Sequence, residues 1–205
     1  MSAATTAEAV SAKTLSQLVR EQASGKEIAR FLDSLSPSER VEQVTSIGGR
    51  GVKYLYDAAA DAEPLGLDWF VPEDEKGTVI LEGKNSLPLF TRFQKRFARI
   101  GDQLIGYNHQ FISLVSFVAG PGYFAVRPPN GTGEHGDELY FDYTVPPPGQ
   151  PAGWPEYTPN EKGLSKPVYG NMIDYCRRVA TGVLVGKAYK LGVEQKAWFT
   201  LTKPR

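Results

Sequence analysis

The sequence is short of the residues that most often build metal and redox sites. It has one cysteine, Cys176, and two histidines, His109 and His135, among 205 residues. A single cysteine cannot form an intrachain disulfide and fits a reducing compartment. A zinc site made of cysteine and histidine ligands would need more of both. We therefore expect no metal site and no disulfide within the chain.

The chain also lacks an excess of charge of either sign. Its 23 lysine and arginine residues equal its 23 aspartate and glutamate residues, so no overall field favours nucleic acid. No apolar run approaches the roughly 20 residues that cross a bilayer as a helix. The first residues, MSAATTAEAVSAKTL, show neither a basic leader nor an apolar signal core. We expect a cytoplasmic protein with no nucleic-acid partner and no integral membrane segment.

Two common catalytic motifs are missing as well. The stretch Gly48-Gly49-Arg50-Gly51 is rich in glycine and precedes a predicted helix. It has no Lys-Ser/Thr pair, however, and it does not follow a strand as a phosphate loop does. A serine-hydrolase elbow, Gly-x-Ser-x-Gly, is also absent. The sequence therefore predicts no cofactor.

The first sixty residues predict helices. Apolar residues between Leu15 and Ile47 recur at spacings of three and four, which is typical of one helical face. Ser36-Pro37-Ser38-Glu39 is a helix start with an N-cap serine, a proline in the first turn and a capping-box glutamate. Because such a stripe must pack on something larger, we assign residues 1–60 to a helical cap.

The last third of the chain predicts antiparallel strands. Between Val168 and Lys203, three runs rich in β-branched and aromatic residues are separated by Thr181-Gly182 and Leu191-Gly192, as in a β-meander. Residues 104–144 show further strand patterns. The proline-rich stretch 146–159 cannot pair as a central strand and crosses the surface or a barrel mouth, where Trp154 is a candidate plug. We predict an α+β fold: the helical cap packs on an antiparallel β-barrel of about eight strands, residues 61–205, in one folding unit.

The closing meander resembles a known family. Tyr169 to Val179, Val183 to Ala188 and Trp198 to Leu201 are similar to the end of the bacterial GXWXG/DUF4334 proteins, which look like small lipocalin-like (calycin) barrels. The resemblance covers the C-terminal meander alone, and Ile47 to Gly51 lacks the tryptophan of the Gly-x-Trp-x-Gly motif. It implies a lipocalin-like barrel that binds hydrophobic small molecules, and it transfers no functional residue.

Residues 85–101 fit two structures. Phe90, Phe93, Phe97 and Ile100 have helical spacing, and the basic residues Arg92, Lys95, Arg96 and Arg99 fall on the opposite face. We predict an amphipathic helix over 87–99 with its basic side chains in solvent. A strand is the alternative, because apolar residues in the same stretch also alternate. The sequence leaves open whether this segment meets a membrane or a partner.

Few polar residues fall among the apolar strands, and these are the candidates for chemistry. If His109, Asp174 or Tyr140 points inward, it could act as a general acid or base. The alternative for His109 is a structural role, with a hydrogen bond at the barrel rim. His135 lies in a polar turn, and we assign it to the surface. Small-molecule sites combine an apolar wall with a few polar anchors. We expect such a cavity to be lined by Phe111, Val115, Tyr123, Phe141, Asp142, Met172, Arg177 and Phe199.

Three functions fit these patterns. We favour a binding protein for a hydrophobic small molecule such as a lipid, an isoprenoid or a polyketide-like compound. The alternative is an enzyme in the same cavity, a cofactor-independent cyclase, isomerase or decarboxylase that encloses a flexible substrate. A third hypothesis is an interaction module that meets a partner protein through the helical cap or the basic segment. The sequence does not name the ligand.

Overall fold

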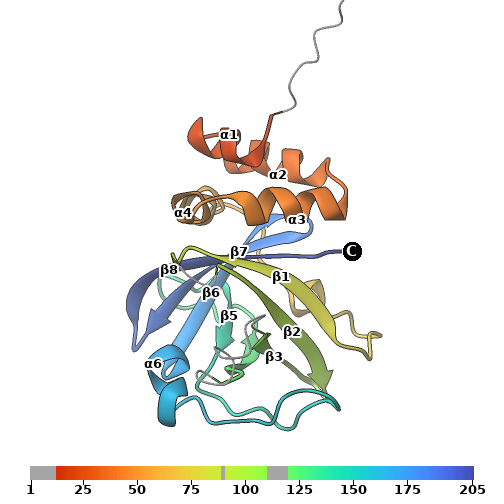
Figure 1. The fold of residues 1–205 in the computed structure, drawn as a ribbon, viewed down its shortest axis with the longest axis vertical. Helices are drawn as coiled ribbons and strands as arrows, with labels where there is room; N and C mark the ends of the chain where they lie inside the picture. The colour runs from red at the N-terminus through yellow and green to blue at the C-terminus, as the bar shows by residue number, and fades with distance from the viewer. Residues whose placement is uncertain (1–12, 89–90, 110–119) are drawn as a thin grey trace, which may run out of the picture.

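The computed structural model describes residues 13–88, 91–109 and 120–205. Within them, eight antiparallel strands form a closed barrel in which each strand pairs with its sequence neighbour and β8 pairs with β1 (Figure 1). The strands are β1 (Val79–Asn85), β2 (Arg92–Ile100), β3 (Gln103–His109), β4 (Tyr123–Arg127), β5 (Leu139–Asp142), β6 (Met172–Ala180), β7 (Val183–Lys190) and β8 (Val193–Thr202). The predicted antiparallel barrel is therefore confirmed.

Helices cover one side of this barrel. They are α1 (Leu15–Arg20), α2 (Gly25–Asp33), α3 (Pro37–Ser46) and α4 (Gly49–Ala58), and Figure 1 shows them stacked above β1, β7 and β8. A short helix α6 (Lys166–Tyr169) lies at the opposite end, next to a single turn, η2 (Gly163–Ser165). The predicted α+β arrangement, with an N-terminal helical cap packed on a barrel, is confirmed.

Local sequence explains where the cap helices begin. Thr14, Ser24 and Ser36 are the N-caps of the first three helices, and each forms a capping box with the residue three positions later. The helices bury Leu32, Val52 and other apolar residues against the barrel, whose contribution includes Val183. The cap is thereby held to the outer face of β6 to β8 by an apolar layer.

The predicted helix over residues 87–99 is wrong. Residues Arg92–Ile100 form β2, which pairs with β1 on one side and β3 on the other. Phe93 and Phe97 are buried as predicted, because a spacing of four puts both on one face of a helix and of a strand. Residues 92–97 pair with β1 and residues 94–100 pair with β3, and this tertiary context overrides the helical spacing.

The prediction that the basic side chains of this segment lie in solvent is correct only in part. Arg92 is exposed, but Lys95 is buried on the same strand face as its phenylalanine neighbours. Arg99 donates hydrogen bonds to Asp68 Oδ1 at 2.6 Å and to the Val71 carbonyl at 3.0 Å. Arg99 thus fixes the loop that precedes β1.

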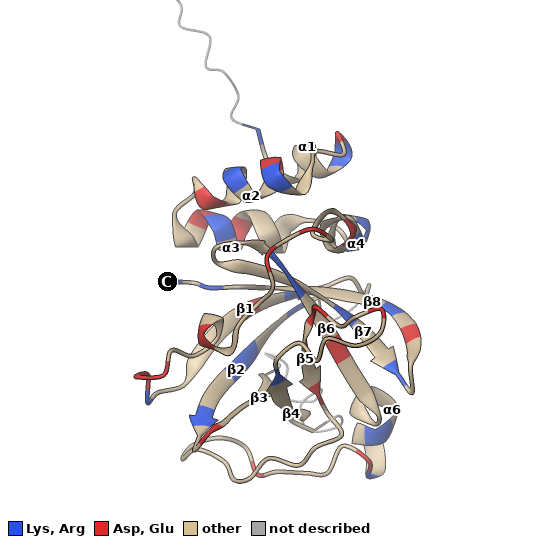
Figure 2. Ribbon diagram, turned by 180° about the vertical axis from the view of Figure 1, so that it is seen from behind, with Lys and Arg blue, Asp and Glu red and all other residues tan. Residues whose placement is uncertain are grey.

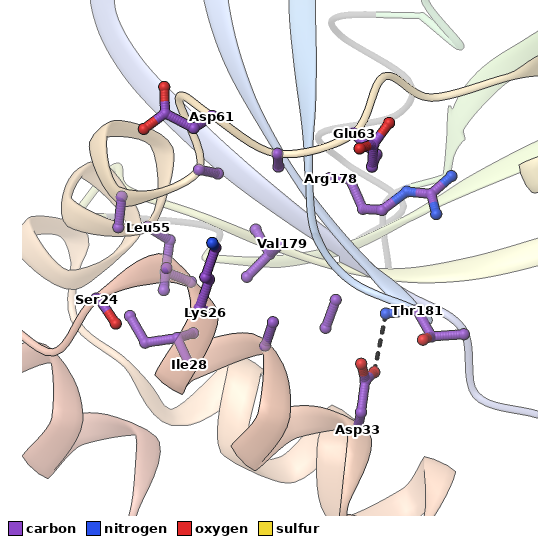
Figure 3. A pocket seen from close by; sticks show the side chains of 16 residues that line it. Ser24, Lys26, Ile28, Asp33, Leu55, Asp61, Glu63, Arg178, Val179 and Thr181 are labelled. Carbon is purple, nitrogen blue, oxygen red and sulfur yellow. Dashed lines mark hydrogen bonds between the residues drawn. The ribbon is translucent and has the colours of Figure 1, made fainter.

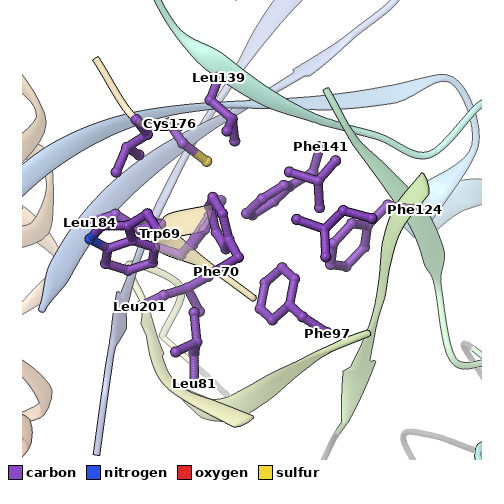
Figure 4. Close-up of a cluster of buried hydrophobic side chains, with 14 of the residues drawn as sticks. Trp69, Phe70, Leu81, Phe97, Phe124, Leu139, Phe141, Cys176, Leu184 and Leu201 are labelled. Atoms are coloured by element: carbon purple, nitrogen blue, oxygen red, sulfur yellow. The ribbon is translucent and has the colours of Figure 1, made fainter. Parts of the chain in front are cut away.

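That loop closes one end of the barrel. It contains a single turn, η1 (Leu67–Trp69), followed by Phe70, whose ring enters the barrel and lies 5.0 Å from the Phe97 ring (Figure 4). Phe124 and Phe141 stack at 4.8 Å deeper in the same cluster. Interiors of eight-stranded barrels are narrow enough to be filled by side chains. At this end, aromatic rings fill it.

Two glycines on the inner wall make room for these rings. A Cβ added at Gly106 would meet the Phe124 ring at 2.5 Å, and one added at Gly186 would collide with the Phe199 ring. The outer ring atoms occupy the space that a Cβ at these positions would fill. Side chains at either glycine would push an aromatic ring out of the core.

The proline-rich loop and Trp154 cover the outside of the barrel. Trp154 contacts the Tyr107 ring at 4.7 Å and forms a buried cluster with Tyr107 and Tyr123 on the opposite strand face from Phe124. Trp154 is therefore no plug in a barrel mouth. Phe70 takes that place at the end nearest η1.

Candidate functional site: a buried polar centre inside the barrel

Lys95 lies inside the barrel, midway along β2. Strand alternation places its side chain on the inner face between Phe93 and Phe97, and the residue is 2 % exposed. Lysine is almost never fully buried unless it is paired. Its surroundings must therefore supply partners for the ammonium group.

Three side chains from three other segments meet the Lys95 ammonium. Its Nζ donates hydrogen bonds to Asn108 Oδ1 on β3 at 2.9 Å and to the Tyr143 hydroxyl, which follows β5. Asp174 Oδ2 on β6 lies 3.3 Å from Nζ and accepts a hydrogen bond from the Tyr143 hydroxyl at 3.1 Å. Asp174 is itself 2 % exposed. The four residues form one connected polar centre.

Aromatic rings surround this polar centre. The Lys95 Nζ lies 4.6 Å from the centroid of the Phe124 ring, 4.9 Å from that of Phe199 and 5.0 Å from that of Phe141. A cation within about 6 Å of a ring centroid is attracted by the negative face of the ring. The rings partly compensate the lost hydration of the ammonium, and they keep water away from it.

Burial dominates the electrostatics of the centre. It lowers the pKa of Lys95 from the ordinary 10.5, and attraction to Asp174 offsets that shift only in part. Burial likewise raises the pKa of Asp174 despite the nearby ammonium. It also raises the pKa of the Tyr143 hydroxyl well above its usual value. Each group is pushed toward its neutral form, as expected where the charged form is poorly solvated.

The centre lies on the α6 side of the aromatic cluster that contains Phe70. The Tyr143 ring stacks on Tyr169 of α6 at 5.7 Å, and Asn108 donates a hydrogen bond to the Gly122 carbonyl at 3.0 Å. Met172, partly exposed, packs against the aromatic core from the start of β6. Aromatic side chains thus fill one end of the barrel, and the polar centre lies between them and α6.

The structure brings four of the predicted site residues together. Phe141, Met172 and Phe199 belong to the interior cluster, and Asp174 supplies the carboxylate of the polar centre. The sequence analysis missed Lys95, Tyr143 and Asn108. The alternation of Phe93, Lys95 and Phe97, and of Leu139, Phe141 and Tyr143, carried the signal for two of them.

Other predicted residues lie on the outer strand faces. Tyr140 and Asp142 alternate with the inward residues of β5, and Asp142 accepts a hydrogen bond from the Thr144 backbone at 2.9 Å. Tyr123 donates its hydroxyl hydrogen to the Pro155 carbonyl at 2.6 Å. His109 shares its face of β3 with Tyr107, at a ring distance of 6.3 Å. These four side chains do not join the polar centre.

Two predicted lining residues, Phe111 and Val115, lie outside the described residues. Their place in a binding site stays a prediction.

Arg177 lies at the junction between the barrel and α4. Its guanidinium donates to Glu138 Oε1 at 3.1 Å and lies 4.1 Å from the Tyr56 ring. The Tyr56 hydroxyl donates to Glu138 Oε2 at 2.6 Å, and burial raises the pKa of Tyr56. Arg177 thus helps hold the cap instead of lining the interior.

His135 belongs to the same junction. Its Nδ1 lies 2.8 Å from Glu138 Oε1, and its side chain is 11 % exposed. The assignment of His135 to the surface is therefore wrong.

A groove of about 540 Å³ lies between the cap and the barrel (Figure 3). Apolar residues such as Ile28 and Val179 line it together with charged groups of both signs. The Asp33 carboxylate accepts a hydrogen bond from the Thr181 backbone at 2.9 Å. The groove contains none of the described residues that were predicted to bind or react, and its mixed charge singles out no ligand class.

Charge over the rest of the molecule is mixed. Figure 2 shows lysine and arginine interspersed with aspartate and glutamate along the helices and strands. In the described part of the chain, no helix is long and apolar enough to cross a membrane. The same residues include no group of three or more His, Cys, Asp or Glu side chains placed to hold a metal ion.

Comparisons with protein-family models, with curated proteins and with solved structures give no match. The resemblance of the meander to the GXWXG/DUF4334 proteins therefore rests on the quoted residues alone. The closed barrel of eight antiparallel strands is consistent with a calycin-like fold. Function has to be argued from the site itself.

Proposed function

We propose that this protein binds an apolar small molecule inside its barrel, with a polar group of that molecule against Lys95. Lipids, isoprenoids and polyketide-like compounds belong to this class, and the proposed compartment is the cytoplasm. One observation carries the proposal: a lysine and an aspartate, each 2 % exposed, face one another among phenylalanine rings.

The stability of the fold does not explain why Lys95 and Asp174 are buried as a pair. Desolvating two charges costs several kcal/mol per ion, and well-packed apolar residues in the same place are often neutral or stabilising by about 1–4 kcal/mol. Polar groups within an apolar enclosure are, in contrast, the usual means of orienting a ligand. The polar centre thus supplies an anchor, and the rings of Phe141 and Phe199 supply the apolar wall.

Charge decides which polar group the anchor prefers. In the Lys95 centre, the ammonium donates to Asn108, Tyr143 and Asp174, so a ligand binds by replacing one of these acceptors, and Asp174 opposes a second carboxylate. A carbonyl, an ester or a hydroxyl is accepted without adding net charge. A carboxylate takes the place of Asp174 as the partner of Lys95 when Asp174 holds a proton, which its raised pKa favours.

Three naphthalenes that differ in one group test the proposal. We expect 2-naphthoate and 2-naphthalenemethanol to bind with Kd in the micromolar range, about −8 kcal/mol, and 2-naphthylmethylammonium to bind far more weakly because of repulsion by Lys95. The measurement is isothermal titration calorimetry of the full chain. Equal affinities for all three, or no binding by any of them, would contradict the proposal.

Variants show whether the probe meets Lys95. Lys95→Met should weaken 2-naphthoate binding by about 1.5–3 kcal/mol, the range of a hydrogen bond to a charged group, which is roughly tenfold or more in Kd. Lys162→Met is the matched control, because Lys162 is an exposed lysine outside the barrel. A parallel loss of affinity in both variants would rule out a specific anchor.

A catalytic role is the second candidate, and one observation favours it. Lys95, Tyr143 and Asp174 are three titratable groups with displaced pKa values within hydrogen-bond reach of one another. Such clusters are enriched at active sites. Native mass spectrometry of the purified protein tests it: a co-purified compound that wild type converts and Asp174→Asn leaves unchanged indicates an enzyme, and an unchanged compound in both indicates a carrier.

A further inference from the structure

We propose that Lys95 captures the carbonyl group of an aldehyde or ketone as an imine, which narrows the ligand class to apolar carbonyl compounds. This inference rests on the proposed function, because the carbonyl compound must first occupy the barrel.

The surroundings of Lys95 fit a nucleophilic amine. A lysine attacks carbonyl carbon only as the neutral amine, and removal from water is the usual way to obtain that form at neutral pH. Lys95 is the buried lysine of the described structure, and burial lowers its pKa. The other lysines lie at exposed or half-buried positions. Its full burial distinguishes Lys95 from the other lysines.

The partners of Lys95 are suited to the proton transfers of imine formation. The Tyr143 hydroxyl contacts Nζ and lies 3.1 Å from Asp174 Oδ2, so a proton can pass between the amine, the phenol and the carboxyl group. Asn108 Oδ1 accepts an N–H of Lys95 at 2.9 Å. That contact holds one N–H of the amine in place.

Each step balances with these groups. The nitrogen lone pair forms a C–N bond to the carbonyl carbon, and the π pair of the C=O bond moves to oxygen. The oxygen gains a proton from Tyr143, and the phenol takes in its place the proton that Asp174 received from the ammonium. The nitrogen then loses one proton to the Asp174 carboxylate, which gives a carbinolamine. Asp174 returns this proton through Tyr143 to the hydroxyl group, the C–O bond breaks, and water leaves. After the iminium gives its remaining N–H proton to Asp174, one amine and one carbonyl have become one imine and one water.

Reductive trapping tests the inference. Wild-type protein is incubated with less than one equivalent of 2-naphthaldehyde and with sodium cyanoborohydride, which reduces an imine to a stable secondary amine. Peptide mass mapping then locates the label. We expect it on Lys95, and we expect an excess of 2-naphthoate to suppress it. Label spread over exposed lysines such as Lys162, with Lys95 unmodified, would overturn the inference.

Two variants separate capture by Lys95 from the assisting role of Tyr143. Lys95→Arg should abolish the principal label, whereas the matched Lys162→Arg should leave the labelling of Lys95 unchanged. Tyr143→Phe keeps the ring but removes the proton donor, and it should slow labelling of Lys95 by about a hundredfold and change its pH profile. If Lys95→Arg does not fold, wild-type mapping with and without 2-naphthoate still decides the question.

Failure of this inference is distinct from failure of the proposed function. Calorimetric binding of 2-naphthoate without any adduct on Lys95 would refute imine capture and leave the binding proposal standing. Absence of both binding and adduct would refute both. An adduct on Lys95 that 2-naphthoate suppresses would support both.

Discussion

Removal of the carboxylate at Asp174 is the perturbation that tests the polar centre most severely. In Asp174→Leu, the Lys95 ammonium keeps its ring neighbours and Asn108 but loses its counter-ion. Breaking one partner of a buried ion pair costs about 3–5 kcal/mol. The cost has an upper limit, because Lys95 can lose its proton instead. At about 1.36 kcal/mol per pKa unit, deprotonation from a pKa of 10.5 costs about 4.8 kcal/mol at pH 7.

We therefore expect Asp174→Leu to lower the free energy of unfolding by about 3–5 kcal/mol in urea denaturation followed by circular dichroism. The triple variant Lys95→Met, Tyr143→Phe, Asp174→Leu removes every charge and the phenol together. It should recover part of that loss, because both charges and the phenol are gone, while the buried Asn108 Oδ1 loses its Lys95 donor. A single-variant loss within about 0.5 kcal/mol, the range of ordinary surface changes, would refute the reasoning. So would a triple variant no more stable than the single one.

The remaining predictions concern packing and pH. Phe70→Ala should cost about 3–5 kcal/mol by opening the plugged end, against less than about 0.5 kcal/mol for the exposed Val193→Ala, both from urea midpoints. Gly186→Ala should cost about 1–3 kcal/mol through overpacking, whereas Gly66→Ala, with open space at the added Cβ, should cost less in the same assay. Burial raises the pKa of Tyr123 to about 12 from 10.0. The stability that this pKa shift contributes is therefore complete below pH 10 and is lost as pH rises through 12. The stability difference between wild type and Tyr123→Phe should shrink over that interval, and a constant difference would contradict it.

The cap and most strands were predictable because their signals are local. The capping box at Ser36 fixes a helix start through residues three positions apart. The turn at Gly192, which has a positive φ of 76°, marks the β7–β8 hairpin for a similar reason. Features of this kind need no knowledge of distant partners.

The β2 strand was not predictable because two periodicities coincide in it. Phe93 and Phe97 share a face in either conformation, whereas Lys95 joins that face only in the strand. The hydrophobic pattern thus did not decide whether the Lys95 side chain lies on the buried face or on the opposite one. That lysine lies at the centre of the candidate site.

The partners of the site were hidden by sequence distance and by barrel orientation. Asp174 stood out by alternating with Met172 and Cys176, but it lies 79 positions from Lys95. Alternation also divides each strand into two faces without saying which one points inward. Tyr123 and His109 were placed on the inner side for that reason. The closed pairing of the strands resolves the choice.

Methionine labelling gives the most direct test of binding inside the barrel. The chain has two methionines, Met1 at its start and Met172, which packs against the interior cluster. With ¹³C-labelled methionine methyl groups, a titration with 2-naphthoate should shift the Met172 signal saturably, with the Kd found by calorimetry, and leave the Met1 signal unchanged. A Met172 signal that stays in place at saturating 2-naphthoate would contradict the central claim that the ligand occupies the barrel.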